Sequence, residues 1–118
     1  MNQQVLDARY ERVRSRLQAY LDRGQVEIHR AYSSDVVDQF PDEYFDWIYI
    51  DGNHLYEYVK QDLTFYYPKV KPGGYICGDD YGAVGWWEDG ITRATDEFIA
   101  LHQLDLTVFG TQFLIQKS

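Results

Sequence analysis

The sequence predicts an α/β fold, in which a mostly parallel sheet carries an antiparallel hairpin at its C-terminal end and helices on both faces. Helical and strand patterns alternate along the chain, as they do in α/β proteins. A helical pattern joins two apolar strands, residues 45–50 and 75–78, and such a connection makes the two strands parallel. Gly110 and Thr111 separate the last two strand patterns, which indicates a β-hairpin.

The composition fits one folded domain that spans residues 1–118. Hydrophobic residues make up 45% and aromatic residues 17% of the chain, which excludes a disordered protein and supplies a modest core. The formal net charge of −8 disfavours nucleic acid and anionic membranes as partners. The single cysteine, Cys77, cannot form an intramolecular disulfide, and no apolar run is long enough to cross a membrane. We therefore expect a cytoplasmic protein.

The N-terminal part of the chain predicts a helix, a strand and a short second helix. Residues 3–23 repeat apolar side chains at intervals of three and four, and Gly24 ends this pattern. We interpret the arginines on the other side of this helix as a solvated face, with a surface for phosphate or an acidic partner as the alternative. Residues 26–32 alternate and predict a strand, and Ser33 or Ser34 caps a helix over residues 35–40.

The rest of the chain supplies the centre of the expected sheet. Residues 45–50 are aromatic and β-branched and predict a buried strand. We then expect a helix over residues 55–67, a turn at residues 71–74, a strand over residues 75–78, a helix from about residue 90, and hairpin strands over residues 104–109 and 112–116. The apolar stripes of the two helices are expected to consist of Leu55, Tyr58, Val59, Leu63 and Tyr66, and of Ile91, Ala94, Phe98 and Leu101.

Acidic residues follow both parallel strands directly. Asp51 comes directly after residues 45–50, and Asp79 and Asp80 come directly after residues 75–78. Parallel strands joined by a helix end at the same edge of the sheet, where open α/β sheets place their ligands. We therefore expect these three carboxylates to lie side by side.

Three segments resemble class I S-adenosylmethionine-dependent methyltransferases: FDWIYIDGNHLYE from Phe45, YPKVKPGGYICGDDY from Tyr67, and GITRATDEF from Gly90. The sequence is most similar to the metal-dependent small-molecule and sugar O-methyltransferases, over the second half of their Rossmann-like sheet. The Lys-Pro-Gly-Gly turn is shared by many such enzymes, whereas IDGNH combined with GDDY is more specific. The resemblance implies metal-assisted transfer of a methyl group from S-adenosylmethionine to a hydroxyl group of a small molecule.

The resemblance also assigns the residues of the site. The metal-binding aspartates of the family match Asp51, Asp79 and Asp80. A divalent cation such as Mg²⁺ would neutralise these like charges, hold two substrate hydroxyls and lower the pKa of one of them. Ser33, by resemblance near the adenine, and Asp51 match cofactor-binding positions. Some relatives have an aspartate base where Asn53 stands; because an amide is not a base, His54 becomes the candidate catalytic base, or else a residue that only caps or packs.

The sequence departs from the family in the half that binds the cofactor. The family's glycine-rich loop and the acidic residue that holds the ribose match nothing before residue 26. We therefore expect a truncated sheet, weak or absent binding of S-adenosylmethionine by this chain alone, and an enzyme that is incomplete as a single chain. The alternative is a non-catalytic methyltransferase remnant that acts as a dimerisation or binding module. A receiver-like or nucleotide-binding domain ranks last. A receiver would need an acidic pair near its start and a late strand that ends in lysine, and a nucleotide site would need a glycine-rich loop; none of these appears.

Loss of the first strands would leave the strand over residues 45–50 with an open edge, which invites pairing. Either residues 26–32 pair there, or a second chain covers the edge in a homodimer, with exchange of the N-terminal helix and strand as one route. The other expected partner is the small-molecule acceptor. Trp86 and Trp87 either stack on that acceptor or form a hydrophobic plug that covers the core or the dimer seam, and Cys77 is interpreted as a core residue.

Overall fold

The computed structural model describes residues 2–86 and 88–118, and the chain forms two compact units, Met1–Tyr32 and Ser33–Ser118. The prediction of one domain over residues 1–118 stays a prediction. Among the described residues, no helix combines the length and the apolar character that crossing a bilayer requires.

The first unit contains two helices where the sequence predicted one over residues 3–23. α1 (Gln3–Arg16) begins after Asn2, whose side chain accepts a hydrogen bond from the Val5 amide at 2.9 Å. The helix ends at Leu17, and α2 (Gln18–Asp22) follows it. The apolar stripe of these helices is exposed or half-buried, since no residue of α1 or α2 is buried.

Residues 26–32 form no strand, so the strand predicted there is wrong. A strand is stable only when a neighbouring strand takes its backbone N–H and C=O groups, and no described strand pairs with this segment. Instead, Arg30 pairs with Asp7 of α1 and lies over the Tyr10 ring, 4.7 Å from its centroid. Side-chain contacts with a helix therefore hold this segment in place of backbone pairing.

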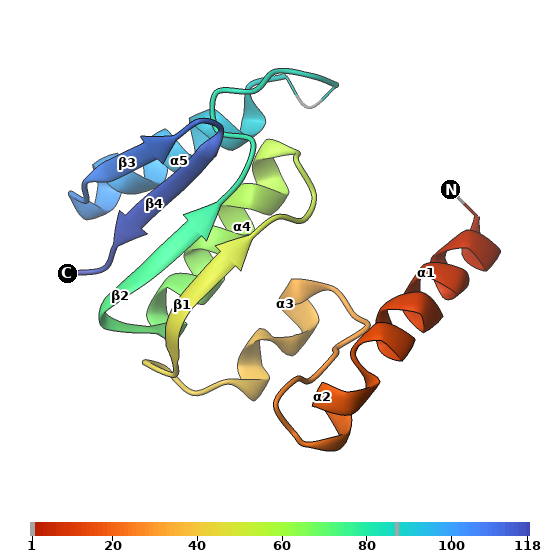
Figure 1. Ribbon diagram of the computed structural model, residues 1–118. Coiled ribbons are helices and arrows are strands. Elements are labelled where there is room, and N and C mark those ends of the chain that lie inside the picture. The colour runs from red at the N-terminus through yellow and green to blue at the C-terminus, as the bar shows by residue number, and fades with distance from the viewer. Residues whose placement is uncertain (1, 87) are drawn as a thin grey trace. The chain divides into compact units, whose positions relative to one another are not determined.

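The second unit is built on a four-stranded sheet (Figure 1). Its elements, in chain order, are α3 (Ser33–Val36), the 3₁₀ turn η1 (Val37–Gln39), β1 (Phe45–Ile50), α4 (Tyr56–Tyr66), the 3₁₀ turn η2 (Tyr67–Lys69), β2 (Val70–Gly78), α5 (Gly90–His102), β3 (Leu106–Phe109) and β4 (Gln112–Gln116). The strand order is β1-β2-β4-β3, with β1 and β2 parallel and β4 antiparallel to both of its neighbours. The α/β class and the C-terminal hairpin are confirmed. The sheet is mixed rather than mostly parallel, because residues 26–32 add no parallel strand.

β2 begins earlier than predicted, because the expected turn at residues 71–74 lies within the strand. The pairing with β1 shifts register between Phe45 and Trp47, which pair with Val70 and Tyr75. Gly73 has φ +82°, and a Cβ on Gly74 would lie 2.5 Å from the Asp46 carbonyl oxygen. The two glycines therefore form an irregularity in a continuous strand, which only residues without a side chain can make.

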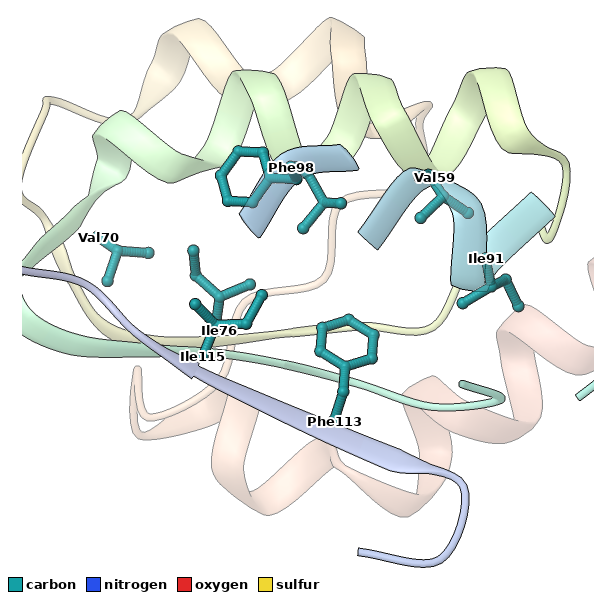
Figure 2. Packing of buried hydrophobic residues seen from close by; sticks show 9 residues of the cluster. Val59, Val70, Ile76, Ile91, Phe98, Phe113 and Ile115 are labelled. Carbon is teal, nitrogen blue, oxygen red and sulfur yellow. The ribbon is translucent and has the colours of Figure 1, made fainter. Parts of the chain in front are cut away.

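The core lies between one face of the sheet and the helices α4 and α5. Figure 2 shows Phe113 and Ile115 of β4 and Ile76 of β2 pointing toward side chains of these helices. The predicted buried residues Val59, Leu63, Ile91, Ala94 and Phe98 are confirmed. Other members of the predicted stripes are exposed, namely Leu55 at 37%, Tyr58 at 45% and Leu101 at 78%. Leu55 precedes the first turn of α4, and Leu101 lies in the last turn of α5. Tyr56 and Tyr67, which were not in the predicted stripes, pack against the core instead.

β1 is an edge strand, as the sequence predicted, and its residue range Phe45–Ile50 is also as predicted. On the sheet face opposite the core, Trp47 is 61% exposed, Tyr49 is 45% exposed and Tyr75 is 40% exposed. Cys77 is half-buried rather than a core residue. A helix on this second face, and a homodimer across the β1 edge, stay predictions.

Candidate functional site at the carboxyl edge of the sheet

The ends of β1 and β2 bring the acidic residues to one edge of the sheet. Ile50 pairs with Gly78, so Asp51 and Asp79 each directly follow the last paired residue of a strand. A Cβ on Gly78 would lie 2.4 Å from the Phe113 ring and 2.9 Å from the Ile50 carbonyl oxygen. Glycine is therefore required at this position, and the Phe113 ring supports the end of β2 from the core side.

His54 forms a cluster with two of the carboxylates. Within the described part of the chain, Asp51, His54 and Asp80 each offer one ligand atom, and these atoms lie within 4.8 Å of one another. The Nε2 atom of His54 lies 2.6 Å from Oδ2 of Asp80, and the two side chains are 25% and 31% exposed. The structure thus brings together the candidate base and two of the three candidate metal ligands.

Asp79, the third candidate ligand, lines the same hollow as Asp51 and His54. Its Oδ1 atom accepts a hydrogen bond from the Asp80 backbone N–H at 2.8 Å and one from the Thr111 hydroxyl at 2.9 Å. These two hydrogen bonds hold the pKa of Asp79 below its ordinary value, and the bond from the Asp80 N–H has the larger effect. Its part in metal binding stays a prediction.

Asp80 has a left-handed backbone conformation, with φ +63°. Such a conformation is uncommon for residues other than glycine and persists where the surroundings enforce it. Here the side chain of Asp79 holds the Asp80 N–H, and the Tyr81 N–H donates to the Thr111 carbonyl at 2.8 Å. The turn formed by Asp79 and Asp80, called the acidic turn below, therefore has a fixed shape that directs Asp80 toward His54.

The loop that carries His54 is fixed by its neighbours. Asn53 accepts a hydrogen bond from the Leu55 N–H at 2.9 Å, and this bond shapes the turn that leads into α4. A Cβ on Gly90 would lie 3.1 Å from the His54 carbonyl oxygen and 2.7 Å from the Tyr56 nitrogen. The first residue of α5 thus packs tightly against the backbone on both sides of Leu55.

Ser33, the predicted cofactor residue, lies at the start of α3 and contacts α4. Its hydroxyl donates to Oδ1 of Asp62, and its carbonyl accepts a hydrogen bond from the Tyr66 hydroxyl at 2.6 Å. Burial raises the pKa of Asp62 above its ordinary value, against the opposing effect of Ser33. A Cβ on Gly52 would lie 3.9 Å from Oδ2 of Asp62, so Ser33 and Asp62 are placed next to the loop that follows Asp51.

The loop after the acidic turn carries Trp86 toward the cluster. The centroid of the Trp86 ring system lies 6.3 Å from that of the His54 ring, and Trp86 is 69% exposed. The start of the loop is anchored to α5, because the Gly82 N–H donates to the Thr92 hydroxyl at 2.8 Å. The prediction about Trp87 falls outside the described residues.

Tyr81, directly after the acidic turn, is also tied to α5. Its hydroxyl donates to Asp96 at 2.7 Å, and this hydrogen bond, with burial and the charge of Asp96, raises the pKa of Tyr81 to about 12. Tyr81 therefore stays protonated at neutral pH and holds the turn against the helix.

The donor set fits a hard divalent cation. Oxygen ligands lie ~2.1 Å from Mg²⁺ and ~2.3–2.6 Å from Ca²⁺, so two ligands of one ion stand up to ~4–5 Å apart. The separations of at most 4.8 Å among the ligand atoms of Asp51, His54 and Asp80 agree with this range. The carboxylates of Asp51 and Asp80 suit Mg²⁺ or Mn²⁺, whereas imidazole is a ligand that Zn²⁺ and other transition metals prefer.

Sequence analysis missed two residues of this site, Thr111 and Asp62. Thr111 could have been found from topology, since antiparallel pairing of β4 with β2 places the start of β4 beside the end of β2. Asp62 stands next to the buried Leu63, and a carboxylate beside the apolar stripe of a helix is a signal for a half-buried contact.

The fold and this site define an α/β protein with an acidic cluster at the carboxyl edge of a mixed sheet. Residues 3–81 match the model of a family described as a methyltransferase domain. The chain therefore belongs to this methyltransferase domain family, and the resemblance seen in the sequence is confirmed.

Individual proteins share part of the fold or the sequence of this chain. The O-methyltransferase NovP superposes with a TM-score of 0.59 and 29% sequence identity, over 74% of this chain and 35% of NovP. A protein from Corynebacterium glutamicum shares the fold at a TM-score of 0.66 and 13% identity, over 92% of this chain and 57% of that protein. The uncharacterized protein R132 of Acanthamoeba polyphaga mimivirus is 41% identical over 51 residues, which are 43% of this chain and 23% of that protein. The chain thus spans less than two thirds of the length of each of these relatives.

Proposed function

We propose that this chain supplies the metal-binding and acceptor side of an S-adenosylmethionine-dependent O-methyltransferase that acts on a hydroxylated small molecule. The observation that carries the proposal is the cluster of Asp51, His54 and Asp80 at the carboxyl edge of the sheet. Transfer to oxygen is supported by the 29% identity with an O-methyltransferase.

The roles of the side chains follow from their contacts. Asp51 and Asp80, with Asp79 beside them, would hold a divalent cation, which when bound lowers the pKa of an acceptor hydroxyl. His54 is the proposed base, and the contact of its Nε2 atom with Asp80 at 2.6 Å places the imidazole within the cluster. The Asp80 carboxylate orients the imidazole and stabilises its charged form once the proton has moved.

The two organic ligands would lie on different sides of this cluster. Ser33, next to the loop after Asp51, supports a cofactor position there, and S-adenosylmethionine when bound supplies the methyl group. Trp86 lies beside His54 and supplies an exposed aromatic surface on which a ring-bearing acceptor can stack.

Two measurements test this function separately. Titration calorimetry with Mn²⁺ is expected to show a site that the Asp80→Asn variant lacks. The same method is expected to show weak binding of S-adenosylmethionine to this chain; a dissociation constant in the low micromolar range would contradict the expected incompleteness.

Transfer is then measured with S-adenosylmethionine carrying a labelled methyl group and a panel of phenolic diols and glycosides, with and without EDTA. Metal-dependent labelling of an acceptor supports the proposal. A chain that binds no cation and labels no acceptor is the non-catalytic remnant, for which the cluster is a relic.

A further inference from the structure

We infer that Thr111 is a positioning residue of the proposed metal site, which it serves by holding the acidic turn from the neighbouring hairpin. The inference rests on the proposed function, since it concerns the same cluster. Thr111 lies far from Asp80 in sequence and belongs to none of the motifs at the strand ends.

Strand pairing explains why a hairpin turn reaches this site. β4 runs antiparallel to β2, with Phe113 paired to Gly78, so the start of β4 lies beside the end of β2. Gly110 has φ +61°, which allows the chain to turn sharply just before Thr111. The turn between β3 and β4 therefore lies against the residues that follow β2.

Thr111 contacts the residues on both sides of Asp80. Its hydroxyl donates to Oδ1 of Asp79 at 2.9 Å, and its carbonyl accepts from the Tyr81 N–H at 2.8 Å. The same Oδ1 atom accepts from the Asp80 N–H at 2.8 Å. One threonine thus fixes the carboxylate that in turn holds the left-handed backbone of Asp80.

Loss of the hydroxyl has a specific consequence. The backbone bond from Tyr81 remains, so the hairpin stays in place, but Asp79 loses the donor that fixes its rotamer. The Asp80 N–H is then held less well, and the 2.6 Å contact of Asp80 with His54 loses its support. Partners that orient metal ligands in this way typically change metal affinity by about 10–100-fold when they are removed.

The test measures Mn²⁺ affinity by electron paramagnetic resonance of the free ion, on the full chain and four variants. Thr111→Val and Thr111→Ala delete the hydroxyl, and Thr111→Ser retains it. Thr107→Val makes the same chemical change on β3 of the same hairpin, outside the Asp79 contact. Circular dichroism on melting establishes which variants are folded.

We expect Mn²⁺ to bind about tenfold more weakly to folded Thr111→Val and Thr111→Ala. Thr111→Ser and Thr107→Val should bind Mn²⁺ within about twofold of the parent. If the hairpin were only loosened by losing a hydroxyl, Thr107→Val would weaken Mn²⁺ binding as well. Parental affinity in either deletion variant overturns the inference and leaves the proposed function intact. If neither deletion variant folds, Thr111 is a structural residue and the inference is equally overturned. If the parent itself binds no Mn²⁺, the proposed metal site fails, and the role of Thr111 fails with it.

Discussion

The Nε2 atom of His54 lies 2.6 Å from Oδ2 of Asp80, and this contact joins the loop after β1 to the turn after β2 across 26 positions of sequence. Asp51 completes the cluster from the end of β1 itself. The arrangement concentrates charge at the edge of an already acidic domain of net charge −8. Such a cluster is stable either because a cation neutralises it or because the rest of the fold tolerates its repulsion.

These two cases predict opposite effects of metal and of charge removal. With a working site, millimolar Mg²⁺ or Mn²⁺ raises the melting midpoint, since a ligand at 100 times its dissociation constant stabilises the native state by about 2.7 kcal/mol. Asp80→Asn should abolish that rise. Differential scanning calorimetry with and without metal measures both quantities.

Asp105→Asn is the control, because it removes one charge from an exposed position before β3 without touching the cluster. It should leave the metal-induced rise unchanged. The opposite pattern, in which metal has no effect and Asp80→Asn melts higher than the parent, would identify the cluster as a relic.

Asp62 predicts a dependence of stability on pH. Burial raises its pKa, so the folded state favours the neutral acid more than the unfolded state does. The stability that this group contributes is fully present below its unfolded pKa of ~3.9, and is lost as the pH rises through the folded pKa. Asp62→Asn removes the charge and keeps an acceptor for Ser33, so it should stabilise the protein at pH 7.

The gain should shrink toward pH 3.5 as both states become protonated. Urea unfolding of parent and variant between pH 3.5 and pH 7 measures the difference. A gain that is constant over this range would show that the charge of Asp62 is not its source.

Much of the second unit could be predicted from the sequence, because its signals are local. The run Phe45–Ile50 predicts a strand and forms one, and Asp51 follows it at the sheet edge, but the strand is not buried as predicted, because it lies at the edge of the sheet. Residues 26–32 have an equally good strand pattern and form none, since a strand depends on a partner that its own sequence does not reveal. Thr111 was missed for a related reason: its function lies in a contact with Asp79, 32 positions away.

Gly74→Ala and Gly52→Ala are a matched pair of variants, whose melting midpoints compare a tightly packed glycine with an open one. A Cβ on Gly74 would lie 2.5 Å from the Asp46 carbonyl oxygen and 2.9 Å from that of Lys71, whereas a Cβ on Gly52 would meet only Asp62 at 3.9 Å. Backbone oxygens cannot move aside as a side chain does, so Gly74→Ala should cost about 1–3 kcal/mol and Gly52→Ala much less. Thermal melting of both variants is the measurement. Equal midpoints would mean that the β1–β2 pairing adapts at Gly74, contrary to this packing.

The open edge of β1 predicts self-association. β1 has a strand neighbour only on the β2 side within the described sheet, and residues 26–32 do not pair with it. Unpaired backbone groups of an edge strand are a template for another strand, and Trp47 on this strand is 61% exposed. We therefore expect a homodimer at micromolar concentration, in size-exclusion chromatography with light scattering.

Lysine on an edge strand opposes such pairing, so Trp47→Lys should shift the protein toward the monomer. Val84→Lys is the matched control, because Val84 is 76% exposed on the loop after the acidic turn and lies outside β1. Each copy carries a net charge of −8, so salt should raise the dimer fraction by screening the repulsion between copies. A parent protein that stays monomeric at tens of micromolar, in low and in high salt, would show that the β1 edge is protected without a second copy.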